Sequence, residues 1–196
     1  MGSLSVNRAI FLDRDGVINK NIFYEHTGEW ESPLTPDHFE LADGAIAALR
    51  QLQSAGLLLF IVSNQPNAAK AKATLETLDE IHQRLIAALD ESQIGFTEFY
   101  YCYHHPAGVV PSLSGPCDCR KPSPHFLLKA AEDHNIDLAK SWIVGDRDTD
   151  VVCGHAAGVR TIRIIDEKGN GSETADYNVA DISAAAKIIL RNSANE

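Results

Sequence analysis

Short apolar runs alternate with longer amphipathic stretches along the chain, and this alternation predicts strands that alternate with helices. The apolar runs predict strands at Ala9–Asp13, Leu57–Ser63, Thr97–Cys102, Ser141–Gly145 and Val159–Ile165. The amphipathic stretches predict helices at Asp43–Ala55, Thr74–Ser92, Ser123 to about Asn135, and Asp181–Arg191. Such alternation is typical of a parallel sheet with helices on both faces. The predicted fold is α/β, a three-layer Rossmann-like sandwich around a mostly parallel sheet of five to six strands.

Capping residues set the predicted helix limits. Asp43 is a predicted N-cap and Gly56 a predicted stop, while Ser123 and Pro124 read as an N-cap and a first-turn proline. Residues 19–39 and 102–122 are predicted to be irregular, and long irregular loops in a compact domain are usually functional or disordered. No segment between the predicted elements is long enough for a large cap domain.

Length and charge narrow the class of protein. The 196 residues are enough for one domain with a core, and 1–196 is predicted to be a single domain. The formal net charge of −10 disfavours nucleic acid or an anionic membrane as the main partner. A small anionic substrate remains compatible with it. Without a long apolar run or a signal-peptide pattern, the chain is expected to be cytoplasmic. We also expect it to be a monomer.

Two aspartates two residues apart, Asp13 and Asp15, end the first predicted strand and precede Gly16. Extended backbone turns both side chains the same way, and close carboxylates repel unless a cation lies between them. Mg²⁺, which prefers oxygen ligands, would remove that conflict. Taken alone, the motif fits equally well an Asx turn that closes a strand.

The other strand ends carry groups that suit the same chemistry. Ser63 and Asn64 end the second strand, and Arg120 and Lys121 follow the third at some distance. The fourth strand leads into Asp146 and Asp150. Because ligands of open α/β sheets bind beyond the carboxyl ends of the strands, these groups are expected to meet. Together they favour metal-assisted phosphoryl transfer, in which an aspartate can act as the nucleophile.

In this order, FLDRDG, IVSN, Lys121 and VGDRDTD resemble the four motifs of the haloacid dehalogenase superfamily of phosphatases, from about Arg8 to Ile165. The resemblance implies that Asp13 is the nucleophile and Asp15 the general acid and base. It also implies the following roles: Ser63 binds the phosphoryl group, Lys121 neutralises it, Asp13, Asp146 and the backbone carbonyl of Asp15 bind Mg²⁺, and Asp150 orients Lys121 or a metal-bound water. Many members have threonine where Val17 stands.

A cysteine and histidine pattern predicts a zinc site. Cys102 and His104 lie at one end of a loop, and Cys117 and Cys119 lie at the other. This spacing fits a tetrahedral structural Zn²⁺ with no open position. His104 shares a side of the extended chain with Cys102, so it is the predicted ligand rather than His105. Free thiols are the alternative. A fourth cysteine, Cys153, is predicted to be a buried residue of a helix.

The zinc loop narrows the resemblance to one subgroup. YYCYHHPAG and CDCRKPSP resemble the subgroup of heptose bisphosphate and histidinol-phosphate phosphatases, with the heptose enzymes nearer. The resemblance implies that Arg120 and Arg147 bind substrate, and Asn64 is a further candidate. Two departures are the stretch SNQPNAAKAKAT, which lacks the glycines common in the heptose enzymes, and the loop 19–39.

The sequence therefore predicts a Mg²⁺-dependent phosphatase that hydrolyses a sugar phosphate, here a heptose bisphosphate, through an aspartyl-phosphate. Histidinol phosphate is the alternative substrate. A binding module stabilised by zinc, with a vestigial site, is the alternative from another class. A phosphatase of nucleic-acid ends is disfavoured by the net charge of −10.

Overall fold

A six-stranded sheet forms the centre of the computed structural model, which describes residues 6–193. The strands are β1 (Ala9–Leu12), β4 (Leu58–Asn64), β5 (Glu98–Cys102), β6 (Trp142–Gly145), β7 (Arg160–Ile164) and β8 (Tyr177–Val179). Their order is β5-β4-β1-β6-β7-β8, and each neighbouring pair is parallel. β1 lies in the middle of this order. From β1 the later strands continue toward one edge through β4 and β5, and toward the other edge through β6, β7 and β8, so the strand order changes direction at β1. A ligand site is therefore expected beyond the carboxyl end of β1.

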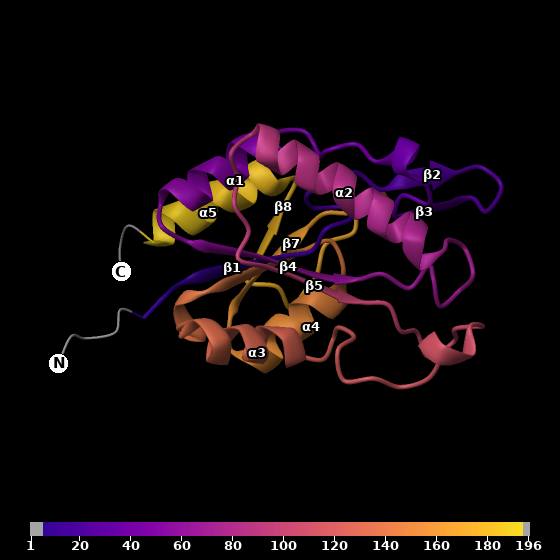
Figure 1. Ribbon diagram of the computed structural model, residues 1–196. Coiled ribbons are helices and arrows are strands. Elements are labelled where there is room, and N and C mark those ends of the chain that lie inside the picture. The colour runs from indigo at the N-terminus through magenta and orange to yellow at the C-terminus, as the bar shows by residue number, and fades with distance from the viewer. Residues whose placement is uncertain (1–5, 194–196) are drawn as a thin grey trace.

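Helices cover both faces of the sheet (Figure 1). On one face lie α1 (Ala45–Ser54), α2 (Leu75–Glu91) and α5 (Ile182–Ser193), and on the other lie α3 (His125–His134) and α4 (Asp148–Ala157). Short 3₁₀ turns are η1 (Pro36–His38), η2 (Pro111–Leu113) and η3 (Leu138–Lys140). Alternate residues of β1 serve the two layers: Ile10 and Leu12 pack with α1 and α5, and Phe11 packs with α3. The predicted three-layer α/β fold is confirmed.

Two predicted helix starts are wrong by one or two residues. The N-cap of α1 is Gly44, with a left-handed φ of 77°, and not Asp43. The carboxylate of Asp43 instead lies 3.2 Å from the Lys20 ammonium. Helix α3 begins after Pro124, so Ser123 lies outside it and its hydroxyl is 3.4 Å from the His125 amide. The predicted ends of α1, α2 and α3 hold to within one residue, and α1 stops before Gly56, whereas α5 continues past the predicted end at Arg191 to Ser193.

The segment 19–39, predicted to be irregular, contains an antiparallel hairpin of β2 (Ile22–Tyr24) and β3 (Glu29–Glu31). The buried ring of Tyr24 anchors it, because its hydroxyl accepts a hydrogen bond from the Leu34 amide at 2.9 Å. The same hydroxyl lies 3.0 Å from Nδ1 of His38. The hairpin projects beyond the carboxyl ends of the central strands, on the side of α2 (Figure 1).

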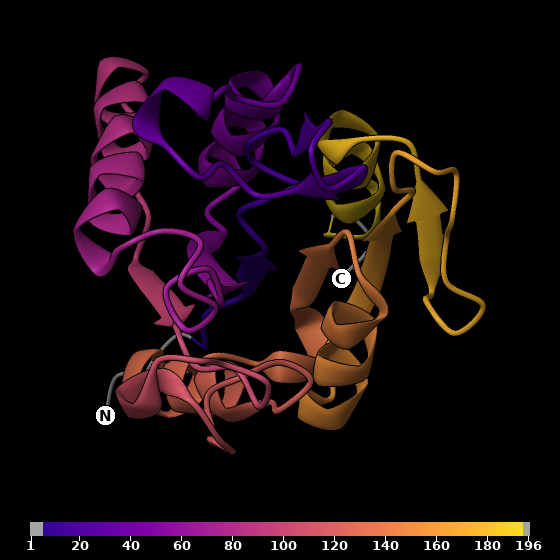
Figure 2. The ribbon, with the colours of Figure 1, turned by 90° about the vertical axis from the view of Figure 1, so that its right-hand side faces the viewer.

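The segment 102–122 lies on the other side of the same edge, as the end-on view shows (Figure 2). Apart from η2 it is irregular, as predicted. It is joined to the loop after β4 through one carbonyl, since Ala69 O accepts hydrogen bonds from the amides of Val109 (2.7 Å) and Val110 (3.1 Å). Within residues 6–193, no helix has the length and apolar character needed to cross a membrane.

Candidate active site

The carboxyl ends of β1, β4 and β6 bring the predicted site residues together. Asp13 directly follows β1, Ser63 and Asn64 end β4, and Asp146 directly follows β6. Gly16 turns the chain after β1 with a φ of +76°, and a Cβ there would lie 2.2 Å from Oδ2 of Asp146. A side chain at this position would therefore collide with the carboxylate, which explains the glycine of the first motif.

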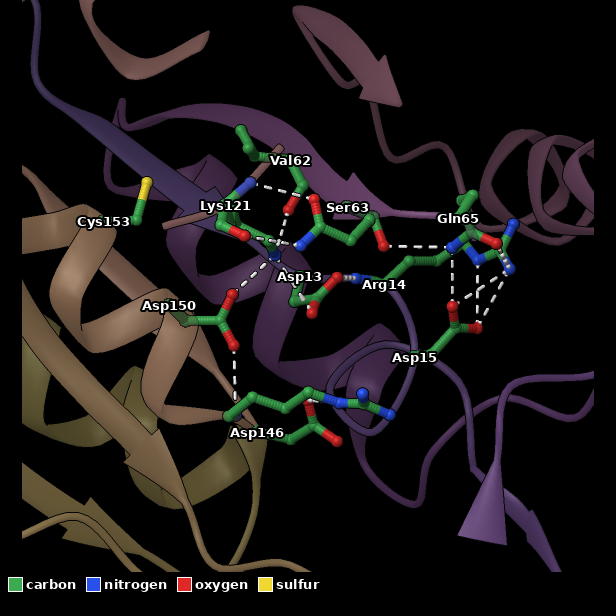
Figure 3. A network of polar contacts seen from close by, with 12 residues as sticks. Asp13, Arg14, Asp15, Val62, Ser63, Gln65, Lys121, Asp146, Asp150 and Cys153 are labelled. Atoms are coloured by element: carbon green, nitrogen blue, oxygen red, sulfur yellow. Dashed lines mark hydrogen bonds and ion pairs between the residues drawn. The ribbon is translucent and has the colours of Figure 1, made fainter. Parts of the chain in front are cut away.

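Lys121 lies at the centre of the site (Figure 3). Its ammonium is 3.0 Å from Oδ2 of Asp13 and 2.5 Å from Oδ1 of Asp150, and it donates a hydrogen bond to the carbonyl of Val62 at 2.6 Å. Burial alone would lower the pKa of Lys121, but the carboxylates of Asp13 and Asp150 outweigh burial and raise this pKa well above its usual range. Lys121 is therefore a permanent buried cation shared between the predicted nucleophile and Asp150.

Asn64 fixes the backbone of Lys121 at two points. Its side-chain oxygen accepts from the Lys121 amide at 3.0 Å, and its side-chain nitrogen donates to the Lys121 carbonyl at 3.1 Å. The following peptide bond, to Pro122, is cis. Asn64 thus places Lys121 against β4, in addition to lining the cavity beside it.

Two further carboxylates lie beside the predicted nucleophile Asp13. Ligand oxygens of Asp13, Asp146 and Asp150 lie within 4.8 Å of one another. Burial raises the pKa of Asp146 to about 7, and the charges of Asp13 and Asp150 add to this effect. Oδ2 of Asp146 accepts from Asn21 at 3.1 Å, whereas its buried Oδ1 has no hydrogen-bond partner among the described residues. A hard divalent cation would satisfy that oxygen and relieve the repulsion, so these residues fit Mg²⁺.

The carboxylate of Asp15 lies apart from this group and is surrounded by donors. Arg14 donates from Nε and Nη2 to Oδ1 (3.1 and 3.0 Å) and from Nη2 to Oδ2 (3.1 Å). Asn19 donates to Oδ1 at 3.0 Å, and Gln65 donates to Oδ2 at 2.6 Å. Gln65 also donates to the hydroxyl of Ser63 at 3.0 Å. We call Arg14, Asn19 and Gln65 the Asp15 donor cluster.

Sequence reasoning missed the donor cluster, although its members lie inside or beside the motifs. Arg14 separates the two aspartates, and Gln65 follows Asn64 directly. All three side chains are buried. A buried arginine is rare unless it is paired, and Arg14 is paired with Asp15. An arginine between two aspartates, directly after an apolar strand, was the available signal.

A cavity of about 210 Å³ opens beside Asp13. Asp13, Asp15 and Lys121 line it, as does Trp30 of the hairpin. Further lining residues are Glu29, Glu31, Ser32, Asn64, Pro66, Asn67, Lys70, Lys72, Arg120, Arg147 and Thr149.

Three cations of this cavity come from three separate segments, namely Lys70, Arg120 and Arg147. Burial lowers the pKa of Lys70, and the nearby charges of Lys72, Arg120 and Arg147 lower it further. Lys72 differs from Lys70 in that it pairs with Glu31 of the hairpin. The cavity therefore has positive charge available for an anionic group. Lys70 was not predicted; its signal was a basic residue in the stretch that departs from the heptose enzymes.

The four predicted zinc ligands lie together at the end of β5. Ligand atoms of Cys102, His104, Cys117 and Cys119 are all within 4.8 Å of one another. Nδ1 of His104 is 3.7 Å from the sulfur of Cys119. His105 lies outside this group, and its Nδ1 accepts from the amide of Ala107 at 3.1 Å. Three thiols and one imidazole around one point fit a tetrahedral Zn²⁺. Cys153 is fully buried in α4, as predicted.

Comparisons with known proteins agree with this geometry. A family model described as HAD-hydrolase-like, for haloacid dehalogenase-like, matches residues 118–187. The D-glycero-beta-D-manno-heptose-1,7-bisphosphate 7-phosphatase of Escherichia coli (strain K12) is 37% identical over 186 residues, covering 91% of this chain and 93% of that protein. The protein of the same name from Yersinia pestis is 35% identical over 187 residues, covering 91% and 95%.

A solved structure is similar over nearly the whole chain. The D,D-heptose 1,7-bisphosphate phosphatase of B. bronchiseptica, complexed with magnesium and phosphate, is 25% identical with a TM-score of 0.76, and the match covers 94% of this chain and 99% of that one. The fold and the family model thus define a hydrolase of the HAD class. At 37% identity over 91% of its length, the chain belongs to the family of the heptose bisphosphate phosphatases, which confirms the resemblance seen in its motifs.

Proposed function

We propose that this protein is a Mg²⁺-dependent phosphatase that removes one phosphate from a sugar bisphosphate, D-glycero-beta-D-manno-heptose 1,7-bisphosphate. The observation that carries the chemistry is the buried Lys121, held 3.0 Å from Asp13 beside the crowded carboxylate of Asp146. This arrangement combines a nucleophile, a fixed cation and metal-binding oxygens at one strand edge. The names of the relatives support the choice of sugar.

The reaction has two steps. A carboxylate oxygen of Asp13 attacks phosphorus, the bond from phosphorus to the sugar oxygen breaks, and Asp15 gives its proton to that leaving oxygen. Water then attacks phosphorus in the aspartyl-phosphate, Asp15 accepts a proton from this water, and the bond to Asp13 breaks. Inorganic phosphate leaves, and Asp15 again carries the proton it had at the start.

Residues held in fixed positions stabilise the negative charge on the transferring phosphoryl group. Lys121 and the hydroxyl of Ser63 contact the phosphoryl oxygens, and Asp150 holds Lys121 in place through their 2.5 Å contact. Asp13, Asp146 and the backbone carbonyl of Asp15 would hold Mg²⁺. When bound, Mg²⁺ supplies positive charge that orients the phosphate and offsets the carboxylates.

The cavity has basic residues that suit the second phosphate. Arg120 and Arg147 line it together with Lys70, and guanidinium groups bind phosphate through paired hydrogen bonds. Zn²⁺, bound by Cys102, His104, Cys117 and Cys119, would order the loop that leads directly into Arg120. The enzyme would act in the cytoplasm on its small substrate.

The test is phosphate release from purified protein across the heptose bisphosphate, histidinol phosphate and p-nitrophenyl phosphate, with and without Mg²⁺. We expect Mg²⁺-dependent release with the bisphosphate preferred. Asp13→Asn keeps the shape of the side chain and should abolish turnover while circular dichroism stays unchanged. Substantial turnover by pure Asp13→Asn protein would contradict the role of Asp13, and a preference for histidinol phosphate would change the substrate.

A further inference from the structure

Trp30 of the hairpin lies where three cavities meet. It lines the cavity of about 210 Å³ at Asp13, and it also lines two neighbouring cavities of about 280 and 450 Å³. Asp146 lines the first of these neighbours and Lys20 lines the second, so we call the three the Asp13, Asp146 and Lys20 cavities. Of the residues that the structure describes, Trp30 alone lines all three.

The Asp13 and Asp146 cavities begin at the same group of carboxylates. Ligand oxygens of Asp13 and Asp146 lie within 4.8 Å of each other, yet the two residues line different cavities. The residues common to both cavities are Glu29, Trp30 and Arg147, and these three form the partition between them. The glutamate and the arginine have long side chains that can turn toward water, whereas the indole is rigid and has only two rotatable bonds. The partition therefore depends on Trp30.

The β2–β3 hairpin by itself would not hold this indole in place. Its strands have three residues each, and an isolated two-stranded hairpin is at best marginally stable in water. Phe23 lies directly opposite Trp30 in the hairpin, with 5.5 Å between the ring centroids. Both side chains remain partly exposed, Phe23 at 47% and Trp30 at 39%. The position of Trp30 therefore depends on contacts outside the hairpin.

Two such contacts fix the residues that directly follow Trp30. Glu31 forms an ion pair with Lys72 of the loop after β4. The hydroxyl of Ser32 accepts a hydrogen bond from the side-chain amide of Asn67 at 2.9 Å, and Asn67 is buried in the same loop. We call these two contacts the hairpin clamp. Because the clamp holds the chain at the two positions after Trp30, it also limits how far the indole can move.

We propose that Trp30 is a specificity-determining residue, whose indole, held by the hairpin clamp, confines the leaving group to the Asp13 cavity. An organic group of the size of one sugar fits beside Asp13, whereas a bulkier group collides with the indole. Loss of the indole would join the Asp13 cavity of about 210 Å³ to the Asp146 cavity of about 280 Å³. This inference rests on the proposed function and adds to it an upper limit on the size of the substrate.

Trp30→Ala tests this limit with two aryl phosphates of different size. p-Nitrophenyl phosphate has one ring, 4-methylumbelliferyl phosphate has two fused rings, and both release a stable phenolate. The readout is kcat/KM for the larger ester divided by kcat/KM for the smaller one. Effects on Mg²⁺ binding, on Asp13 or on phosphate binding are shared by the two esters and cancel in this ratio.

We expect the ratio to be well below one in the wild type and to rise about tenfold or more in Trp30→Ala, since one extra methylene group in a pocket already changes kcat/KM by about 10–200-fold. Trp30→Tyr keeps a large ring and should stay near the wild-type ratio. Phe23→Ala is the matched control, because Phe23 packs on Trp30 but lines none of the three cavities. It weakens the hairpin without removing the partition, so its ratio should equal that of the wild type.

The clamp is tested with the indole intact. Lys72→Glu places two like charges together at Glu31 and should raise the ratio, because the hairpin moves away from the loop. Adding Glu31→Lys restores an ion pair with the charges exchanged and should lower the ratio again. A change in the charge of the cavity alone would act on both aryl phosphates and leave the ratio unaltered.

An unchanged ratio in Trp30→Ala, or an equal rise in Phe23→Ala, would overturn the inference and leave the proposed function intact. Equal kcat/KM for the two esters in the wild type would do the same. Should Trp30→Ala fail to fold by circular dichroism, an unchanged ratio in Lys72→Glu would overturn the inference by itself. Wild-type protein that releases no phosphate from either ester or from the heptose bisphosphate in the presence of Mg²⁺ would overturn both the inference and the proposed function.

Discussion

Replacing Asp150 by asparagine tests how strongly the Lys121 ion pairs stabilise this fold. Asp150 is fully buried, and it has two partners: the Lys121 ammonium at 2.5 Å and the Arg147 amide, which donates to Oδ2 at 3.0 Å at the start of α4. The asparagine side chain could still accept one of these bonds through its single oxygen. Its amide nitrogen would then face the other donor, either the ammonium or the helix amide.

The expected loss in the free energy of unfolding depends on the partners that Lys121 keeps in Asp150→Asn. Breaking a buried ion pair by removing one partner costs about 3–5 kcal/mol in the free energy of unfolding. Lys121 keeps Asp13 at 3.0 Å and the carbonyl of Val62 at 2.6 Å, so we expect the lower end, about 3 kcal/mol. Asp150→Asn also removes repulsion from Asp146. Saturating Mg²⁺ in the buffer would keep this second effect small, because the proposed cation would offset the carboxylates.

Urea unfolding followed by circular dichroism measures the difference, with Asp148→Asn as the matched control. Asp148 opens the same helix, but its side chain is 73% exposed and its contact to Arg163 is 3.9 Å long. Loss of a charge near the helix start costs about 0.3–1 kcal/mol there. A loss below 1 kcal/mol in Asp150→Asn, or equal losses in the two variants, would refute the reasoning.

The remaining predictions concern the acid, the zinc loop, the cavity and one strained residue. Asp15→Asn should slow release of the sugar by roughly 10²–10⁴ and that of p-nitrophenolate far less, and equal losses would count against its role as acid. Elemental analysis should find one Zn²⁺ per chain, which Cys117→Ser loses and His105→Ala keeps; the reverse would exchange the ligands. Lys70→Ala should raise KM for the bisphosphate about tenfold or more and barely change KM for p-nitrophenyl phosphate, whereas equal increases would exclude a contact to the second phosphate. Ala71 has a left-handed φ of 54°, so Ala71→Gly should stabilise the fold by up to about 1 kcal/mol in urea, and a clear loss would show that the strain is not there.

The sequence was sufficient for β1, β4, β6 and β7 of the central sheet because these four strands are buried on both faces. Runs such as the one ending at Leu12 are continuously apolar, and they are long enough to distinguish from their surroundings. Strands β2, β3 and β8 have three residues each, too few to show an alternating pattern. Helix α4 was difficult for the opposite reason, since Val151, Cys153 and Ala157 are all buried and leave it without a clear polar face.

The residues of the site also fall into those that the sequence predicted and those that it did not. Asp13, Asp15 and Asp146 could be predicted because acidic residues at strand ends are unusual and the rule for open sheets brings those ends together. The partners of Asp15 could not, because the direction of the Gln65 side chain depends on how β4 lies beside β1. The contribution of Lys70 to the cavity likewise depends on how its loop packs against Val109 and Val110, which no local pattern encodes.

The double hydrogen bond on the Ala69 carbonyl has a consequence for engineering this enzyme. Ala69 lies in the loop after β4, while Val109 and Val110 belong to the segment between the predicted zinc ligands. The fit between them is tight, since a Cβ on Gly108 would lie 3.1 Å from that carbonyl. A loop grafted from a relative would therefore have a surface shaped to fit the neighbouring loop of that relative, and not the neighbouring loop of this chain. New substrate preferences should be obtained more readily when the two loops are exchanged as a pair, and chimaeras that exchange one alone should recover activity through second-site changes in the other.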